Sequence, residues 1–131
     1  MTKLIVLAED DIDDQDMVRE IVGVINSDLD LRIFNDGETL IESMKELPKG
    51  DLPNLIVLDQ NMPRLKGSDT IRHLKQISGF ENIPVVIYTT YHDNKFAETC
   101  RIMNVELFQK PDTFEEFSRM IGGLIDRYVN V

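Results

Sequence analysis

"LIVLDQNMP", residues 55–63, is a run of four apolar residues that ends on an acid, Asp59, and an Asn-Met-Pro turn. Two similar apolar runs occupy residues 4–8 and 85–88. Unbroken apolar runs of this length are typical of parallel strands that helices cover on both faces of a sheet. The three runs therefore predict the central strands of a parallel sheet.

Two further segments are apolar but more mixed, which indicates edge strands: residues 31–34 and 105–108. Apolar residues recur with helical spacing between and after the strands, over residues 17–25, 40–47, 71–77, 96–103 and 114–128. Strict alternation of strands and helices predicts an α/β fold. We expect a doubly wound parallel sheet of five strands in the flavodoxin-like order 2-1-3-4-5, with five helices.

The length and charge of the chain limit its number of domains and its kinds of partner. A chain of 131 residues suits one domain, 1–131. Its formal net charge of −10 repels nucleic acid and anionic membrane, so neither is an expected partner. No apolar run approaches membrane-spanning length, and residues 4–8 are too short for a signal peptide, which predicts a cytoplasmic location. Cys100 is the single cysteine, so an internal disulfide is impossible.

Polar and charged side chains follow four of the predicted strands. Glu9 and Asp10 follow the first strand, Asp59 follows the third, Thr89 the fourth and Lys110 the fifth. The carboxyl ends of parallel strands share one edge of the sheet, where ligands bind in folds of this kind. We therefore expect residues that are far apart in the sequence to meet there.

Crowded carboxylates repel one another and require either a proton or a cation. Oxygen ligands without His or Cys favour a hard cation, and a site with few protein ligands and an incoming phosphate suits Mg²⁺. The backbone carbonyl of Asn61 could complete such a site. A carboxylate beside Mg²⁺ can attack phosphorus to form an acyl phosphate. Asp59 fits the nucleophile, and Thr89 and Lys110 fit the groups that neutralise the incoming charge.

Several short motifs occur in a specific order along the chain: Glu9-Asp10, Asn35-Asp36-Gly37, Asp59-Gln60-Asn61-Met62-Pro63, Gly67, Thr89 and Lys110-Pro111. In their order and spacing, they resemble the receiver domain of two-component response regulators, of the single-domain kind similar to the chemotaxis regulator. The resemblance covers essentially the whole chain.

The resemblance implies a role for each matching residue. Asp59 would be the phosphoacceptor, and Thr89 and Lys110 would contact the phosphoryl group. The implied metal ligands of Mg²⁺ are Glu9, Asp10, Asp59 and Asn61. The resemblance also implies a cis peptide bond between Lys110 and Pro111, because the corresponding bond of the family is usually cis.

One position departs from the family. The residue three before Lys110 is usually Tyr or Phe, which swings inward on phosphorylation, but here it is Leu107 and the aromatic residue is Phe108. Either the switch residue is aliphatic or Phe108 takes that role, and we favour Leu107.

The expected function is a phosphorylation-driven switch that receives its phosphoryl group from a sensor histidine kinase or a histidine phosphotransfer protein and acts on a downstream protein target. We expect self-phosphorylation and slow self-dephosphorylation at Asp59, without turnover of an external substrate, in a monomer or weak dimer. One alternative is a phosphorelay intermediate. Another is a phosphatase similar to the haloacid dehalogenases, which typically carry a second Asp where this chain has Asn61.

Overall fold

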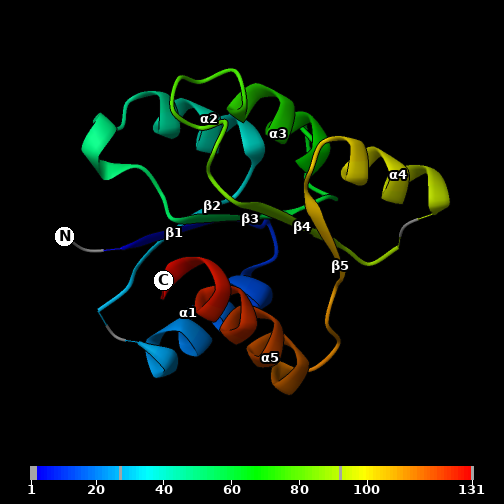
Figure 1. Ribbon diagram of the computed structural model, residues 1–131. Coiled ribbons are helices and arrows are strands. Elements are labelled where there is room, and N and C mark those ends of the chain that lie inside the picture. The colour runs from blue at the N-terminus through cyan, green and yellow to red at the C-terminus, as the bar shows by residue number, and fades with distance from the viewer. Residues whose placement is uncertain (1–2, 27, 92, 131) are drawn as a thin grey trace.

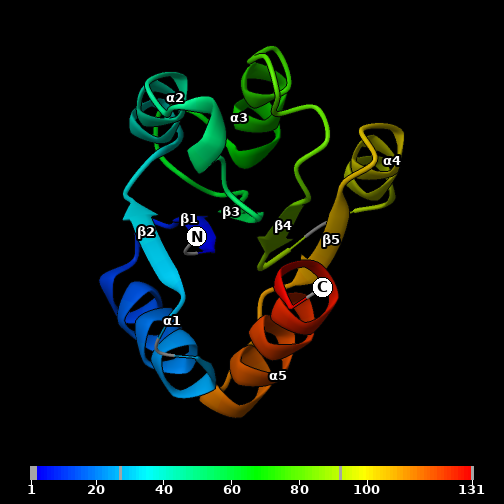
Figure 2. The ribbon, with the colours of Figure 1, turned by 60° about the vertical axis from the view of Figure 1, so that its left-hand side comes forward.

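The computed structural model describes residues 3–26, 28–91 and 93–130. In these residues five parallel strands form one sheet in the order β2-β1-β3-β4-β5, which confirms the predicted order. The strands are β1 (Leu4–Ala8), β2 (Asp30–Phe34), β3 (Leu55–Asp59), β4 (Val85–Thr89) and β5 (Glu106–Gln109). Figures 1 and 2 show the sheet between two layers of helices.

The described residues also contain the five predicted helices: α1 (Ile12–Ile25), α2 (Gly37–Lys45), α3 (Gly67–Leu74), α4 (Asn94–Ile102) and α5 (Phe114–Leu124). Helices α1 and α5 cover one face of the sheet, and α2, α3 and α4 cover the other (Figure 1). A short 3-10 turn, Lys49–Asp51, precedes β3. Within the described ranges, none of the helices has the length and apolar character needed to cross a membrane.

The burial of the strands follows their place in the sheet. All five residues of β1, β3 and β4 are buried, whereas β2 and β5 are partly exposed at the edges. Side chains along a strand alternate between the two faces. Leu55 and Val57 pack on the side of α1 and α5, so Asp59, two residues further, lies on that side too. The alternation thus sets the direction in which the acid at the end of β3 points.

Side-chain caps begin four of the five helices in the described residues. The capping residues Asp11, Asp36, Asp93 and Thr113 each accept a hydrogen bond from the backbone N–H three residues further along the chain. Such a cap is worth about 1 kcal/mol relative to alanine. The acids that follow β1 and β2 therefore start α1 and α2 without long connecting loops.

The helices and strands differ from their predicted ranges at several ends, and the last strand and the last helix show how. The last strand runs over Glu106–Gln109, one residue later than the predicted 105–108. The last helix is α-helical only as far as Leu124 and continues as a π-helical turn, Ile125–Val129, in which the Asn130 N–H donates to the Ile125 carbonyl at 2.9 Å. The wider turn keeps both Ile125 and Val129 fully buried, and an apolar stripe does not distinguish it from a regular helix.

Gly67, the first residue of α3, lies against the strand end that carries Asp59. A Cβ atom at Gly67 would lie 2.7 Å from the Asp59 carbonyl oxygen and 3.1 Å from the Gln60 Cα. Both are backbone atoms, so side-chain rotation cannot relieve the contact. We therefore expect Gly67→Ala to lower the free energy of unfolding by about 1–3 kcal/mol, measured by urea denaturation.

Gly123, within α5, provides the matched control, because a Cβ there would have no neighbour within 4 Å. We expect Gly123→Ala to raise the free energy of unfolding by roughly 0.5–1 kcal/mol, because alanine is the better helix former. Equal unfolding midpoints for the two variants would contradict the steric argument at Gly67.

Candidate functional site

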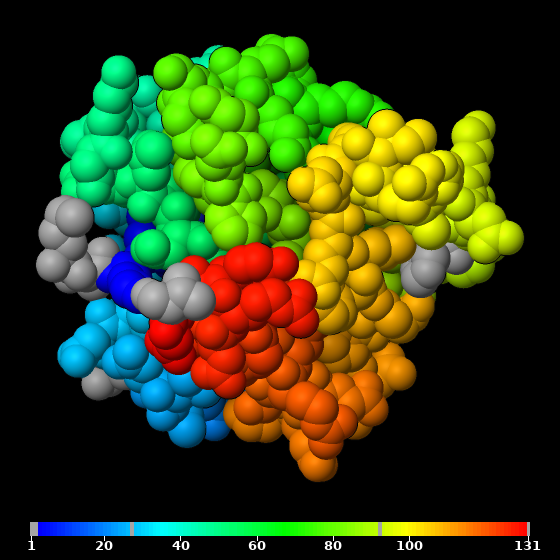
Figure 3. Space-filling model, viewed as in Figure 1, coloured from blue at the N-terminus to red at the C-terminus, as the bar shows by residue number. Residues whose placement is uncertain are grey.

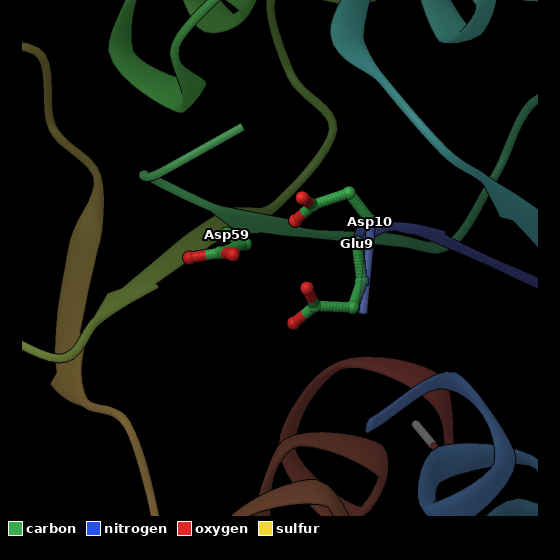
Figure 4. A group of neighbouring side chains, drawn as sticks. All are labelled: Glu9, Asp10 and Asp59. Atoms are coloured by element: carbon green, nitrogen blue, oxygen red, sulfur yellow. The ribbon is translucent and has the colours of Figure 1, made fainter. Parts of the chain in front are cut away.

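Three carboxylates meet at the carboxyl ends of β1 and β3. Glu9 and Asp10 follow β1, and Asp59 is the last residue of β3. One carboxylate oxygen from each of the three lies within 4.8 Å of the others. Figure 4 shows the carboxylates of Glu9 and Asp10 directed toward Asp59. The predicted acidic cluster is therefore formed.

The three acids differ in burial. Asp10 is exposed, but Glu9 is 0% exposed and Asp59 is 4% exposed. Burial raises the pKa of Glu9 to about 7, although hydrogen bonds from Tyr88 and from the Asp11 N–H lower it in part. Burial also raises the pKa of Asp59, against the hydrogen bond from the Asn61 N–H and the charge of Lys110. A bound cation would favour the ionised form of both groups.

The donor set of the cluster consists of carboxylate oxygens alone. These acids line a cleft of about 510 Å³ together with Asn61, Thr90 and Lys110. Oxygen ligands favour a hard divalent cation, and an open cleft leaves room for the waters that Mg²⁺ retains. The chemistry of the residues thus fits a divalent metal ion.

Asn61 and Thr89 lie next to the cluster and contact each other. The Asn61 N–H donates to Asp59 Oδ1 at 3.2 Å, and the Asn61 side-chain amide donates to Thr89 Oγ1 at 3.1 Å. The Thr89 hydroxyl donates to the Tyr91 carbonyl at 2.9 Å. Thr89 itself is fully buried. The structure therefore brings both residues to the site, where the hydroxyl of Thr89 already has partners.

Lys110 reaches the site from the residue after β5. Its Nζ lies 3.5 Å from Glu9 Oε1 and 2.6 Å from Asp14 Oδ2. The predicted cis bond between Lys110 and Pro111 was wrong, because the bond is trans. Trans is the intrinsically favoured form of an X-Pro bond by about 0.5–1 kcal/mol. The Lys110 N–H donates to the Thr89 carbonyl at 2.8 Å, which extends the pairing of β5 with β4.

Sequence reasoning missed Tyr88, which lies beneath the acidic cluster. Its hydroxyl donates to Glu9 Oε1 at 2.5 Å, and its ring packs edge-on against Phe117 with 5.8 Å between centroids. Lys110 Nζ lies 5.7 Å from the centre of the same ring. In the sequence Tyr88 is one more residue of an apolar strand. The register pairs Tyr88 with Asp59, so the two side chains lie on the same face of the sheet. Strand alternation was therefore the signal that could have placed Tyr88 near the acids.

We expect Tyr88→Phe to lower the free energy of unfolding by about 1–2 kcal/mol, because Glu9 loses a buried hydrogen-bond donor. The measurement is urea denaturation at a pH above the pKa of Glu9, in the presence of a chelator. Tyr91→Phe is the control, because the Tyr91 side chain is 78% exposed. An equal effect of the two substitutions would contradict a role for the Tyr88 hydroxyl.

Two contacts fix the loop after Asp59, and both are made by residues outside the acidic cluster. The Gln60 side-chain carbonyl accepts a hydrogen bond from the Ser68 N–H at 2.8 Å. Arg64, in the left-handed region with φ 67°, lies 2.9 Å from the Asp36 carboxylate. These contacts connect the loop to the starts of α3 and α2. They hold the backbone of Asn61 next to the acids.

The two candidate switch residues of β5 lie on opposite faces of the sheet. Leu107 packs against the same apolar cluster as Phe96 and Met103, on the side of α4, whereas Phe108 packs against the cluster on the side of α5. Each is only partly buried. Leu107 pairs with Ile87, two residues before Thr89. By alternation it therefore shares a face of the sheet with Thr89.

Comparison with known families gives one match, which covers most of the chain. Residues 5–121 match the model of the response regulator receiver domain. The match includes all the residues of the acidic cluster and extends past Lys110.

Individual proteins of this kind are similar over nearly the full length. Response regulator Rcp1 of Synechocystis is 29% identical over 126 residues, covering 93% of this chain and 86% of Rcp1. The Mn²⁺-bound form of Rcp1 superimposes with a TM-score of 0.84 at 27% identity, covering 98% of this chain and 96% of the other. The phosphorylated cyanobacterial phytochrome response regulator RcpA gives a TM-score of 0.88 at 20% identity, covering 98% and 95%. The similarity to RcpA supports the fold alone.

Proposed function

Because this chain belongs to the family of response regulator receiver domains of two-component signalling, we propose that it is a switch driven by phosphorylation of Asp59. The proposed donor is a phosphohistidine of a sensor histidine kinase or a histidine phosphotransfer protein. The observation that supports this most directly is the cluster of Glu9, Asp10 and Asp59, whose carboxylate oxygens lie within 4.8 Å of one another. We propose that residues 1–131 act as one receiver domain.

In the proposed reaction a carboxylate oxygen of Asp59 attacks the phosphorus of phosphohistidine. The new O–P bond forms as the N–P bond breaks, and the imidazole leaves with the bonding electrons. Little covalent chemistry is required of the protein, so positioning and charge compensation dominate.

Mg²⁺ is the proposed cofactor, and it would supply positive charge to the phosphoryl oxygens. Its proposed ligands are Glu9, Asp10, Asp59 and the carbonyl of Asn61. Thr89 and Lys110 are proposed to contact the transferred group. The Mn²⁺-bound form of Rcp1 supports a divalent ion in a relative, and the oxygen-only donor set supports Mg²⁺ here.

The proposed output is a change in the face formed by α4, β5 and α5, which lie side by side on one surface of the molecule (Figure 3). Phosphorylation would shift the population between two arrangements of this face, and a downstream protein would bind one of them. We propose Leu107 as the switch residue, because it lies on the same face of the sheet as Thr89 and packs with residues of the α4 side.

The phosphatase alternative requires a second acid to shuttle a proton, and Asn61 occupies that position. The Asn61 amide cannot carry out this step and is already engaged with Thr89. A cytoplasmic location belongs to the proposal, because the phosphoryl group of a histidine kinase comes from ATP.

The experiment that tests the proposal is intact-mass measurement after incubation with acetyl phosphate, in Mg²⁺ or in a chelator. We expect one added phosphoryl group in Mg²⁺ only, and its removal by hydroxylamine, which cleaves acyl phosphates. Failure to form an adduct in a sample that demonstrably binds Mg²⁺ would reject the proposal. Return of the group to a histidine phosphotransfer protein would identify the chain as a relay.

A further inference from the structure

Lys110 is held by a carboxylate that does not belong to the acidic cluster. Its Nζ lies 2.6 Å from Asp14 Oδ2, which is closer than its distance of 3.5 Å to Glu9. In the parts of the chain that the structure describes, Lys110 forms ion pairs with these two acids and none with Asp59 within 4.0 Å. The amine that the proposed reaction needs is therefore directed toward α1.

The contact between Asp14 and Lys110 is sheltered. Each of the two side chains is only 17% exposed. Beneath the amine lies the ring of Tyr88, 5.7 Å from Nζ. Asp14 comes from the first turn of α1, and Lys110 is the residue after β5, so this pair joins distant parts of the sequence. A sheltered ion pair is less screened by water and salt than an exposed one.

An acid in the first turn of a helix has a simpler role, which is to interact favourably with the helix dipole. Asp13 has that role as well, and it is exposed. The dipole explains the presence of both acids, but it does not explain why the Asp14 side chain turns inward to a lysine. Asp13 therefore provides a natural internal control.

We propose that Asp14 is a positioning residue that holds Lys110 away from Asp59 before phosphorylation. This inference rests on the proposed phosphorylation of Asp59. The Lys110 amine must exchange the Asp14 carboxylate for the phosphoryl oxygens as the group arrives. Asp14 thus competes with the phosphoryl donor for the same amine. Its removal leaves Lys110 with only the longer contact to Glu9, at 3.5 Å, so the amine turns more readily to the donor.

The test compares Asp14→Asn with Asp13→Asn, which removes the same charge from the same helical turn. The initial rate of phosphorylation is measured against acetyl phosphate concentration in saturating Mg²⁺. We expect the KM for acetyl phosphate to fall about two- to fivefold in Asp14→Asn, the upper part of the range for ion pairs near a protein surface. Asp13 lines the cleft, so Asp13→Asn measures the general effect of one lost charge, and it should lower the KM by less than Asp14→Asn does. Asp14→Glu, which keeps the charge, should restore most of the wild-type KM.

The Kd for Mg²⁺ separates this role from a general effect of charge. Both variants lose one negative charge near the cleft, so both should weaken Mg²⁺ binding slightly and to a similar extent. A lower KM for acetyl phosphate together with an unimproved Kd for Mg²⁺ would therefore identify the release of Lys110. Equal KM values for the two variants, or a higher KM in Asp14→Asn, would overturn the inference.

A spectroscopic measurement tests the position of Lys110 separately from the phosphorylation of Asp59. The ¹H–¹⁵N signal of the Lys110 ammonium group, recorded without donor, should shift in Asp14→Asn and remain in place in Asp13→Asn. A wild-type protein that takes no phosphoryl group would overturn the proposed function and the competition together, whatever the spectrum shows. A wild type that is phosphorylated, with an unshifted Lys110 signal in Asp14→Asn, would overturn the inference alone.

Discussion

Asp59→Asn is expected to abolish phosphoryl uptake from acetyl phosphate and, at the same time, to make the metal-free protein more stable. The amide removes the proposed nucleophile, so no adduct should appear by intact mass. Asp59 is almost fully buried, and burial raises its pKa. A raised pKa means that the ionised carboxylate costs folding free energy at neutral pH. An amide of the same shape avoids that cost.

We expect the free energy of unfolding of Asp59→Asn to exceed that of the wild type by about 1–3 kcal/mol in a chelator. The Asn61 N–H keeps an oxygen acceptor at residue 59, so its hydrogen bond can persist. Excess Mg²⁺ should reduce or reverse the difference, because it stabilises the wild type by binding the folded state. Urea denaturation with and without Mg²⁺ measures both effects.

Asp69→Asn serves as the control for charge, because Asp69 is an exposed acid of α3. Its effect on unfolding should lie within about 0.5 kcal/mol of zero, as is usual for surface positions. If Asp59→Asn were less stable than the wild type without metal, the account of crowded, buried carboxylates would be wrong. If it still gained one phosphoryl group, Asp59 would not be the phosphoacceptor.

The second large effect is the dependence of Mg²⁺ binding on pH. Metal ions bind the ionised carboxylate, and the pKa of Glu9 is raised to about 7. Protons therefore compete with Mg²⁺ below that pH. We expect the affinity for Mg²⁺ to fall by about a hundredfold between about pH 8 and pH 5, or about tenfold for each pH unit below 7. Isothermal titration calorimetry at several pH values gives the slope.

The metal-free protein should show the opposite trend in stability. The folded-state pKa of Glu9, about 7, lies above its ordinary value of 4.5, so the folded state binds more protons between these values. Stability therefore falls as the pH rises from 4.5 to 7 and levels off above that range. The loss attributable to Glu9 is on the order of 3 kcal/mol, and Asp59 adds a contribution of the same sign.

Glu9→Gln is the matched variant for both measurements, because it keeps the shape of the side chain and removes the titrating group. We expect it to bind Mg²⁺ weakly and to lose most of the fall in stability between pH 4.5 and 7. A wild-type Mg²⁺ affinity that is constant over this range would show that Glu9 is not the group that competes with the metal.

The fold and the acidic cluster could be predicted because they depend on regular patterns. The buried strands are unbroken apolar runs, and parallel topology brings their carboxyl ends together whatever the sequence separation. Asp59 was located from the end of one such run. Strand alternation puts its side chain on the same face as Leu55 and Val57, and the structure shows that α1 and α5 cover this face.

The contacts of individual side chains were not predictable in this way. The hydrogen bond from Tyr88 to Glu9 spans 79 positions, and no local pattern records it. The ion pair between Asp14 and Lys110 was not predictable either, because the inward turn of the Asp14 side chain depends on where the end of β5 places Lys110. The isomer of the bond before Pro111 depends on a difference of about 0.5–1 kcal/mol, which local sequence does not determine.

The pairing of Lys110 with the first helix has a consequence for protein synthesis. A ribosome produces Glu9, Asp10 and Asp14 early, but Lys110 directly follows β5, the last of the described strands to be made. A nascent chain that has the acids without the lysine lacks the positive charge that offsets them, and it also lacks one edge of its sheet. By our proposal such a chain cannot compensate an arriving phosphoryl group. We therefore expect phosphoryl uptake only after the sheet is complete, so an unfinished chain does not take part in signalling.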